Sequence, residues 1–170
     1  AQEAVVTAVK KNPESFDANF SAGQILARSG SNSSIVLPFY KKAAEIEPSN
    51  SKVLRELAGT YYDLGNKEES ITIFRNAISN EIDKIVKADL YFNLGVIYSQ
   101  MCDYEEAEIA FDEAFFLNEE DFEAALGMAR SYEGLGDNYL NGSEGCGGAF
   151  EKDLDKAAKW FRNCLLYTSP

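Results

Sequence analysis

The sequence predicts an all-α protein built from antiparallel helix pairs. Three observations carry this prediction: a recurring five-residue block, a second block that follows it, and turn residues between the two. In the first block a large apolar residue precedes a small one, two others and a tyrosine, and its copies start 37 and 34 residues apart. The copies are Leu57-Ala58-Gly59-Thr60-Tyr61, Leu94-Gly95-Val96-Ile97-Tyr98 and Met128-Ala129-Arg130-Ser131-Tyr132.

The second block has internal steps of four and three residues, which is the spacing of one helix face. Its copies are Val36…Tyr40…Ala43, Ser70…Phe74…Ala77, Ala107…Phe111…Ala114 and Ala157…Phe161…Cys164. The apolar members form a buried stripe on each helix. The small members, such as Gly95 and Ala77, let the two backbones approach closely. Each pair of blocks therefore predicts one helical hairpin.

Turn residues separate these helices. Gly65 stops a first helix because glycine adopts positive φ without strain, whereas Cys102 does the same at some cost in strain. Asn50 offers an N-cap after Pro48, and Pro38 is expected near the first turn of its helix, where a missing N–H is tolerated. The helices are predicted at 1–11, 15–29, 35–46, 51–64, 67–79, 85–101, 104–117, 121–135 and 153–166.

These residues resemble the tetratricopeptide repeat (TPR) family, whose pattern is Leu-Gly/Ala-x-x-Tyr, then Gly, then Ala-x-x-x-Phe-x-x-Ala and Pro. The resemblance implies a right-handed α-solenoid of about nine helices, formed by a single array over residues 1–170. Its repeats are expected at 16–50, 51–84, 88–121 and 122–169, after a partial repeat at 1–15. The closing proline of the family is missing where Ile82, Glu119 and Ser169 stand. Opening on half a repeat suggests a longer array.

The last repeat carries a Gly-rich insertion at 137–152, which we expect to be a surface loop. The Gly-Lys-Ser/Thr ending of a phosphate loop is missing, and Tyr139 and Gly148 stand where a calcium loop needs acids. A flap that contacts a partner is the functional alternative. The helix after the insertion, from Lys152 to Trp160, is similar to the related Sel-one-like repeat. We expect Trp160 to pack on a neighbouring repeat, with an exposed partner anchor as the alternative.

Composition excludes several functions. Twenty-eight acids against 16 bases give a net charge of −12, opposite to that of most nucleic-acid binders, and no apolar run is long enough to insert in a membrane. Without histidine, the commonest general base and zinc ligand is missing. Adjacent carboxylates such as Glu105 and Glu106 point apart on a helix and cannot converge on a substrate. We expect no enzyme activity, no cofactor and no metal site.

The three cysteines are too few for a disulfide scaffold. We expect three free thiols, with a Cys146–Cys164 bridge as the alternative. The sequence shows no signal peptide, so the compartment stays open: cytoplasm is favoured over export, although a signal cleaved before Ala1 would leave the same sequence.

The resemblance implies a noncatalytic scaffold that binds a peptide or helix of a partner protein in a concave groove lined by the first helices. The expected groove residues are Phe20, Gln24, Lys52, Arg55, Tyr62, Asp89, Phe92, Asn93, Val96, Glu123, Leu126 and Arg130. The cations Lys52, Arg55 and Arg130 stand out in an acidic chain and would attract an acidic group of a ligand. Only Arg55 and Asn93 match the carboxylate clamp of some family members, so that clamp is not expected. The alternative is a self-assembling or regulatory module that acts through its repeat ends or its insertion.

Overall fold

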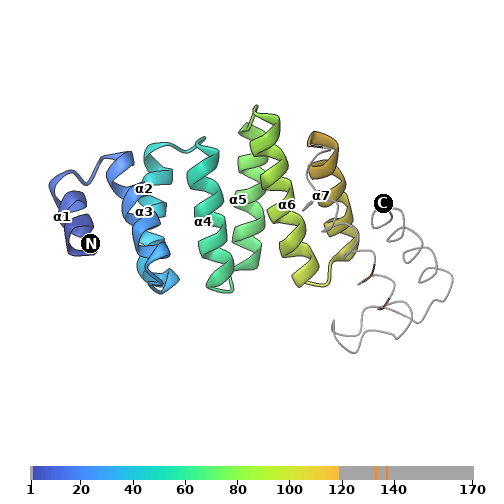
Figure 1. Ribbon diagram of the computed structural model, residues 1–170, viewed down its shortest axis with the longest axis horizontal. Coiled ribbons are helices and arrows are strands. Elements are labelled where there is room, and N and C mark those ends of the chain that lie inside the picture. Colours follow the sequence, from blue (N-terminus) through green and yellow to red (C-terminus); the bar gives the residue numbers. More distant parts are fainter. Residues whose placement is uncertain (1, 119–132, 134–136, 138–170) are drawn as a thin grey trace. The chain divides into compact units, whose positions relative to one another are not determined.

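The computed structural model describes residues 2–118, 133 and 137, and those residues fold into helices joined by short turns (Figure 1). The helices are α1 (Gln2–Lys11), α2 (Phe16–Arg28), α3 (Ser33–Ile46), α4 (Ser51–Asp63), α5 (Lys67–Asn80), α6 (Lys84–Gln100) and α7 (Tyr104–Leu117). The all-α solenoid of antiparallel helix pairs is confirmed. The helices expected at 121–135 and 153–166, and the insertion at 137–152, lie outside the described residues apart from positions 133 and 137.

The chain divides into two compact units. The N-terminal unit, Ala1–Glu81, contains α1 to α5, and its helices pack on one another in chain order, as Figure 1 shows. The C-terminal unit, Ile82–Pro170, contains α6 and α7, which pack together as a hairpin. The predicted helix bounds agree with the observed ones to within two residues over α1 to α7.

Short polar side chains begin four of the helices by accepting hydrogen bonds from free backbone N–H groups. Asn50 caps α4 as expected, with its Oδ1 3.1 Å from the N–H nitrogen of Lys52. Asn32 caps α3 through the N–H of Ser34. Because α3 therefore begins at Ser33, Pro38 is its sixth residue and lies beyond the first turn. The expectation for Pro38 was wrong: it removes one hydrogen bond from the helix interior.

Three turns end the first helices of their hairpins with a residue at positive φ: Gly30 after α2, with a φ of +75°, Gly65 after α4 and Cys102 after α6. Gly65 has a φ of +82°, and the N–H of Asn66 then bonds the carbonyl of Tyr61 at 2.9 Å. Cys102 plays the same part after α6 with a φ of 62°, and the N–H of Asp103 bonds the carbonyl of Tyr98. The predicted strain at Cys102 is thus confirmed, since a Cβ disfavours this region.

Cys102 also forms a disulfide bond. The expectation of three free thiols was therefore wrong. The alternative, a bridge between Cys146 and Cys164, was also wrong because it left Cys102 as a free thiol. Both of those cysteines lie outside the described residues. Cysteine spacing alone did not reveal the bond because a disulfide depends on distance in space, and this turn gave no sequence sign of a nearby thiol.

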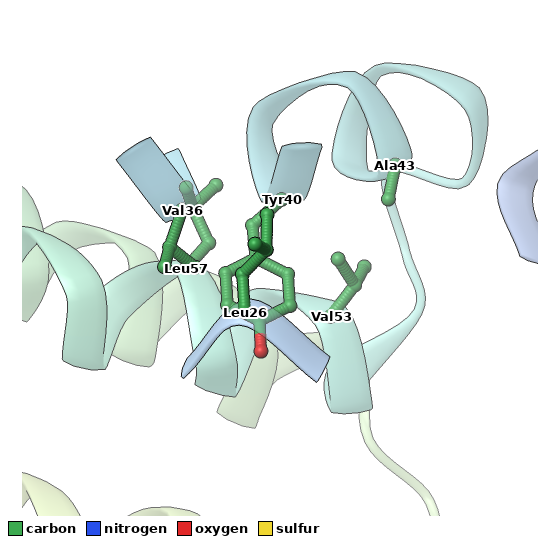
Figure 2. Packing of buried hydrophobic residues seen from close by; sticks show 6 residues of the cluster. All are labelled: Leu26, Val36, Tyr40, Ala43, Val53 and Leu57. Carbon is green, nitrogen blue, oxygen red and sulfur yellow. The ribbon is translucent and has the colours of Figure 1, made fainter. Parts of the chain in front are cut away.

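The core of the N-terminal unit lies where α2, α3 and α4 meet. Figure 2 shows six residues of this buried cluster, with Tyr40 in the middle. They are Leu26, Val36, Tyr40, Ala43, Val53 and Leu57. Tyr40 is 1% exposed, and a Cβ added at Gly23 would lie only 2.4 Å from its ring. In the C-terminal unit a Cβ at Gly95 would lie 2.8 Å from the ring of Phe111. The predicted role of the small residues in close helix approach is therefore confirmed.

Candidate functional site

One face of α4 carries the candidate residues of the N-terminal unit. Lys52, Arg55 and Tyr62 follow one another at steps of three and seven, so they lie along one side of the helix. Lys52 is exposed, while Arg55 and Tyr62 are half-buried. The opposite side of the helix is anchored by Val53 and Leu57, which belong to the core. The packing of α4 thus turns the three candidates away from the core, in a fixed row.

Arg55 has an ion-pair partner that periodicity did not indicate. Its Nη2 lies 3.3 Å from Oε1 of Glu56, and the two side chains are 41% and 32% exposed. An ion pair this open contributes about 0–1 kcal/mol. Glu56 therefore holds the guanidinium only weakly. Glu56 at the same time adds a negative charge to this part of the surface.

The hydroxyl of Tyr40, on α3, is influenced by charged side chains of α2 and α4. Burial and, after it, the carboxylate of Glu56 raise the pKa of Tyr40, and the guanidinium of Arg28 lowers it; the net result is a pKa of about 12. Arg28 and Glu56 thus act on the same hydroxyl from two different helices. Neither residue was among the candidates expected from the sequence. For Arg28 a signal was present, because it continues the four-residue spacing of Phe20 and Gln24 along α2.

Phe20 serves the core as well as the surface. Its ring stacks on Phe16, with centroids 5.5 Å apart, and lies 6.0 Å from the ring of Tyr40. Phe20 is half-buried and packs against the core cluster. Of the two candidates expected on α2, Gln24 is the polar one and is also half-buried.

Replacing Tyr40 by phenylalanine should reduce the decrease in the free energy of unfolding that occurs at alkaline pH. The folded chain keeps the Tyr40 proton up to a pKa of about 12, whereas the ordinary value is 10.0. The contribution of this group is fully present below pH 10 and is lost as pH rises through the folded pKa. Denaturant unfolding of both proteins from pH 9 to 12 should show the wild type losing stability faster than Tyr40→Phe. Parallel curves would contradict the buried hydroxyl.

The candidates of the C-terminal unit lie on one face of α6. The face begins at Asp89 and continues with residues three, four and seven positions further along the helix, which are Phe92, Asn93 and Val96. All four residues are half-buried. The amide of Asn93 donates to the backbone carbonyl of Asp89 at 2.6 Å. The ring of Phe92 packs on Phe111 of α7, with centroids 5.6 Å apart and planes tilted by 55°. This face therefore presents a fixed amide, a carboxylate and the edge of an aromatic cluster.

The structure thus brings the candidates together within each unit. Lys52, Arg55 and Tyr62 belong to the N-terminal unit, and the four residues of α6 belong to the C-terminal unit. Glu123, Leu126 and Arg130 lie outside the described residues. Peptide side chains and backbone are commonly bound by guanidinium, ammonium, carboxylate, amide and aromatic groups.

Among the described residues, no three Cys, Asp or Glu side chains gather closely enough to hold a metal ion. In the same residues, no helix combines the length and the apolarity needed to cross a bilayer.

Family comparisons agree with the repeated hairpins. Three sequence models of the tetratricopeptide repeat match the chain, at residues 1–51, 54–81 and 88–121. The chain belongs to the tetratricopeptide repeat family. The Sel-one-like character expected at residues 152–160 has no matching model among them and lies outside the described residues. No curated protein matches this TPR chain in sequence.

Several solved structures are similar to this TPR chain in fold. The crystal structure of MamA has a TM-score of 0.72 at 19% identity, over 98% of this chain and 85% of that one. A tetratricopeptide repeat protein from Parabacteroides merdae ATCC 43184 has a TM-score of 0.72 at 22% identity, over 98% of this chain and 58% of that one. YrrB, described as a TPR protein with an unusual peptide-binding site, has a TM-score of 0.62 at 18% identity, over 99% and 94%. At these identities the likeness concerns the fold.

Proposed function

We propose that this TPR chain is a noncatalytic scaffold that binds a peptide or helix of a partner protein along the first helices of its hairpins. In the N-terminal unit the contact surface is the row of Lys52, Arg55 and Tyr62 on α4. In the C-terminal unit it is the α6 face that includes Asp89 and Asn93. The family is the first support, because TPR proteins typically bind proteins, and YrrB has a peptide-binding site.

The observation that carries the proposal is the polar row on α4, beside a packed core. Lys52 and Arg55 are two cations in a chain of net charge −12, and the ion pair of Arg55 with Glu56 is open to solvent. The half-buried ring of Tyr62 is on the same side of the helix. Cations next to an aromatic favour a ligand that carries a carboxylate and an apolar side chain.

Reversing both cations should abolish partner binding. The full chain with Lys52→Glu and Arg55→Glu is compared with wild type in a pull-down from the native lysate, with the bound proteins identified by mass spectrometry. We expect at least one protein to be retained by wild type and reduced at least about tenfold by the variant, because like charges at a contact are strongly unfavourable.

The matched control reverses two cations of the second helices, Lys41 on α3 and Lys67 on α5, to glutamate. It carries the same net charge and should retain the partner. Circular dichroism should show equal helicity for all three proteins. Equal retention by the Lys52/Arg55 variant would refute the α4 surface, and an equal loss in the control would attribute binding to net charge alone.

A further inference from the structure

A pocket opens between α1 and α3 of the N-terminal unit, away from the α4 row. Its volume is about 560 Å³. Pockets that bind small ligands typically have volumes of about 300–1,000 Å³, so this pocket lies within that range. Val6, Leu26, Ile35 and Phe39 give it an apolar lining. Ile35 is 54% exposed, so this apolar surface is open to a partner.

The charge at this pocket is positive, against the trend of the chain. Among the described lining residues, Lys10 is the charged one, and Lys11 follows it in the last turn of α1. Both are exposed, and no ion pair within residues 2–118 includes either. The pocket therefore favours an occupant with apolar side chains and a pair of carboxylates.

One face of α7 has this chemistry. Ile109 and Phe116 lie seven residues apart on one side of the helix and are 56% and 76% exposed. Asp112 and Glu113 lie between them on the same side, and both are exposed. Large exposed apolar side chains in line mark a contact surface more often than isolated ones do. The α7 face is thus apolar at both ends and acidic in the middle.

The acidic middle of this face would gain from a nearby cation. Partial desolvation, and then the charge of Glu113, raise the pKa of Asp112 above its ordinary value. Two lysines placed opposite would offset that repulsion.

We propose that the α7 face of one copy docks into the α1/α3 pocket of a second copy, with Ile109 and Phe116 in the apolar lining and Asp112 and Glu113 against Lys10 and Lys11. The contact joins two different surfaces, so it is head-to-tail and extends into chains or closes into rings. The net charge of −12 opposes association at long range. At physiological ionic strength that repulsion is screened beyond about 8 Å, whereas the direct contact is not.

Light scattering after size-exclusion chromatography tests the proposal on the full chain, at physiological ionic strength and over a wide range of concentration. The average mass of the wild type should rise with concentration. Two charge-reversed proteins then test the faces. The pocket variant carries Lys10→Glu and Lys11→Glu, and the α7 variant carries Asp112→Lys and Glu113→Lys. Each alone should raise the apparent dissociation constant at least about tenfold and remain monomeric where wild type associates.

The mixture of the two variants is the decisive arm. In the mixture each pocket meets an α7 face of opposite charge, so the rise in mass should return although neither variant associates alone. All four substituted positions are exposed, so folding should be unaffected, as circular dichroism can verify. The Lys41→Glu/Lys67→Glu protein is the charge-matched control for the pocket variant and should associate like wild type.

Three results would overturn the proposal. A wild type that stays monomeric at every concentration would show that a second copy does not fill the pocket. Association that survives both reversals would place the contact elsewhere, and a mixture that stays monomeric would show that the two faces do not meet. The Lys52/Arg55 pull-down involves other residues, so partner binding and self-association are tested separately.

Discussion

Replacing Tyr40 by alanine should lower the free energy of unfolding by about 3–5 kcal/mol, the range for removing a large aromatic from a core. Tyr40 is 1% exposed and is the largest side chain in the cluster shared by α2, α3 and α4. Its ring contacts Phe20 and fits against Gly23. Truncation would leave a cavity between three helices, which short helices cannot close by themselves. Urea unfolding followed by circular dichroism measures the loss.

The matched control is Ile35→Ala, which removes an apolar side chain from the same helix at a position 54% exposed. That change should alter the free energy of unfolding by no more than about 0.5 kcal/mol, as is usual for surface substitutions. If Tyr40→Ala and Ile35→Ala had similar effects, Tyr40 would not be the center of the core.

Replacing Gly95 by leucine should destabilise the protein by about 1–3 kcal/mol, because it overpacks the α6/α7 hairpin. Even the first added carbon would lie 2.8 Å from the ring of Phe111, which is itself 2% exposed and has little room to move. The helices would have to separate, and the contact between Phe92 and Phe111 would change with them. The thermal midpoint should fall.

Replacing a glycine that has free space around it should have the opposite effect on stability. Nothing lies within 4 Å of a Cβ built at Gly59, which is in the interior of α4. Gly59→Ala should therefore raise stability by about 0.5–1 kcal/mol, because alanine favours the helix. A fall in stability at Gly59, or no change at Gly95, would mean that close approach of the helices does not decide which glycines are needed.

The fold could be predicted well because helical periodicity is a local property of the chain. The spacing of Phe74 and Ala77, or of Leu94 and Tyr98, already defines a buried stripe, and the structure buries all four. Capping at Asn50 and the positive φ of Gly65 are equally local and were equally visible. Pro38 was misplaced because α3 begins two residues earlier than expected, at Ser33.

The candidate site was less accessible to sequence reasoning. Helix spacing placed Lys52, Arg55 and Tyr62 on one face of α4, but it could not show that Glu56 pairs with Arg55. That contact depends on side-chain rotamers. Nor could it show that Arg28 and Glu56 act on one tyrosine hydroxyl, which requires the packing of three helices. The disulfide of Cys102 was missed for the same reason.

The order in which the helices pack has a consequence for how the N-terminal unit folds. Each of α1 to α5 contacts its neighbour in the sequence, so the loops that must close during folding are short. Proteins rich in such local contacts reach the native state quickly, on about the microsecond-to-millisecond scale. Folding can start at any hairpin and spread to the next, because every interface resembles the one before it. The chain can thus acquire its structure as it leaves the ribosome, one hairpin at a time.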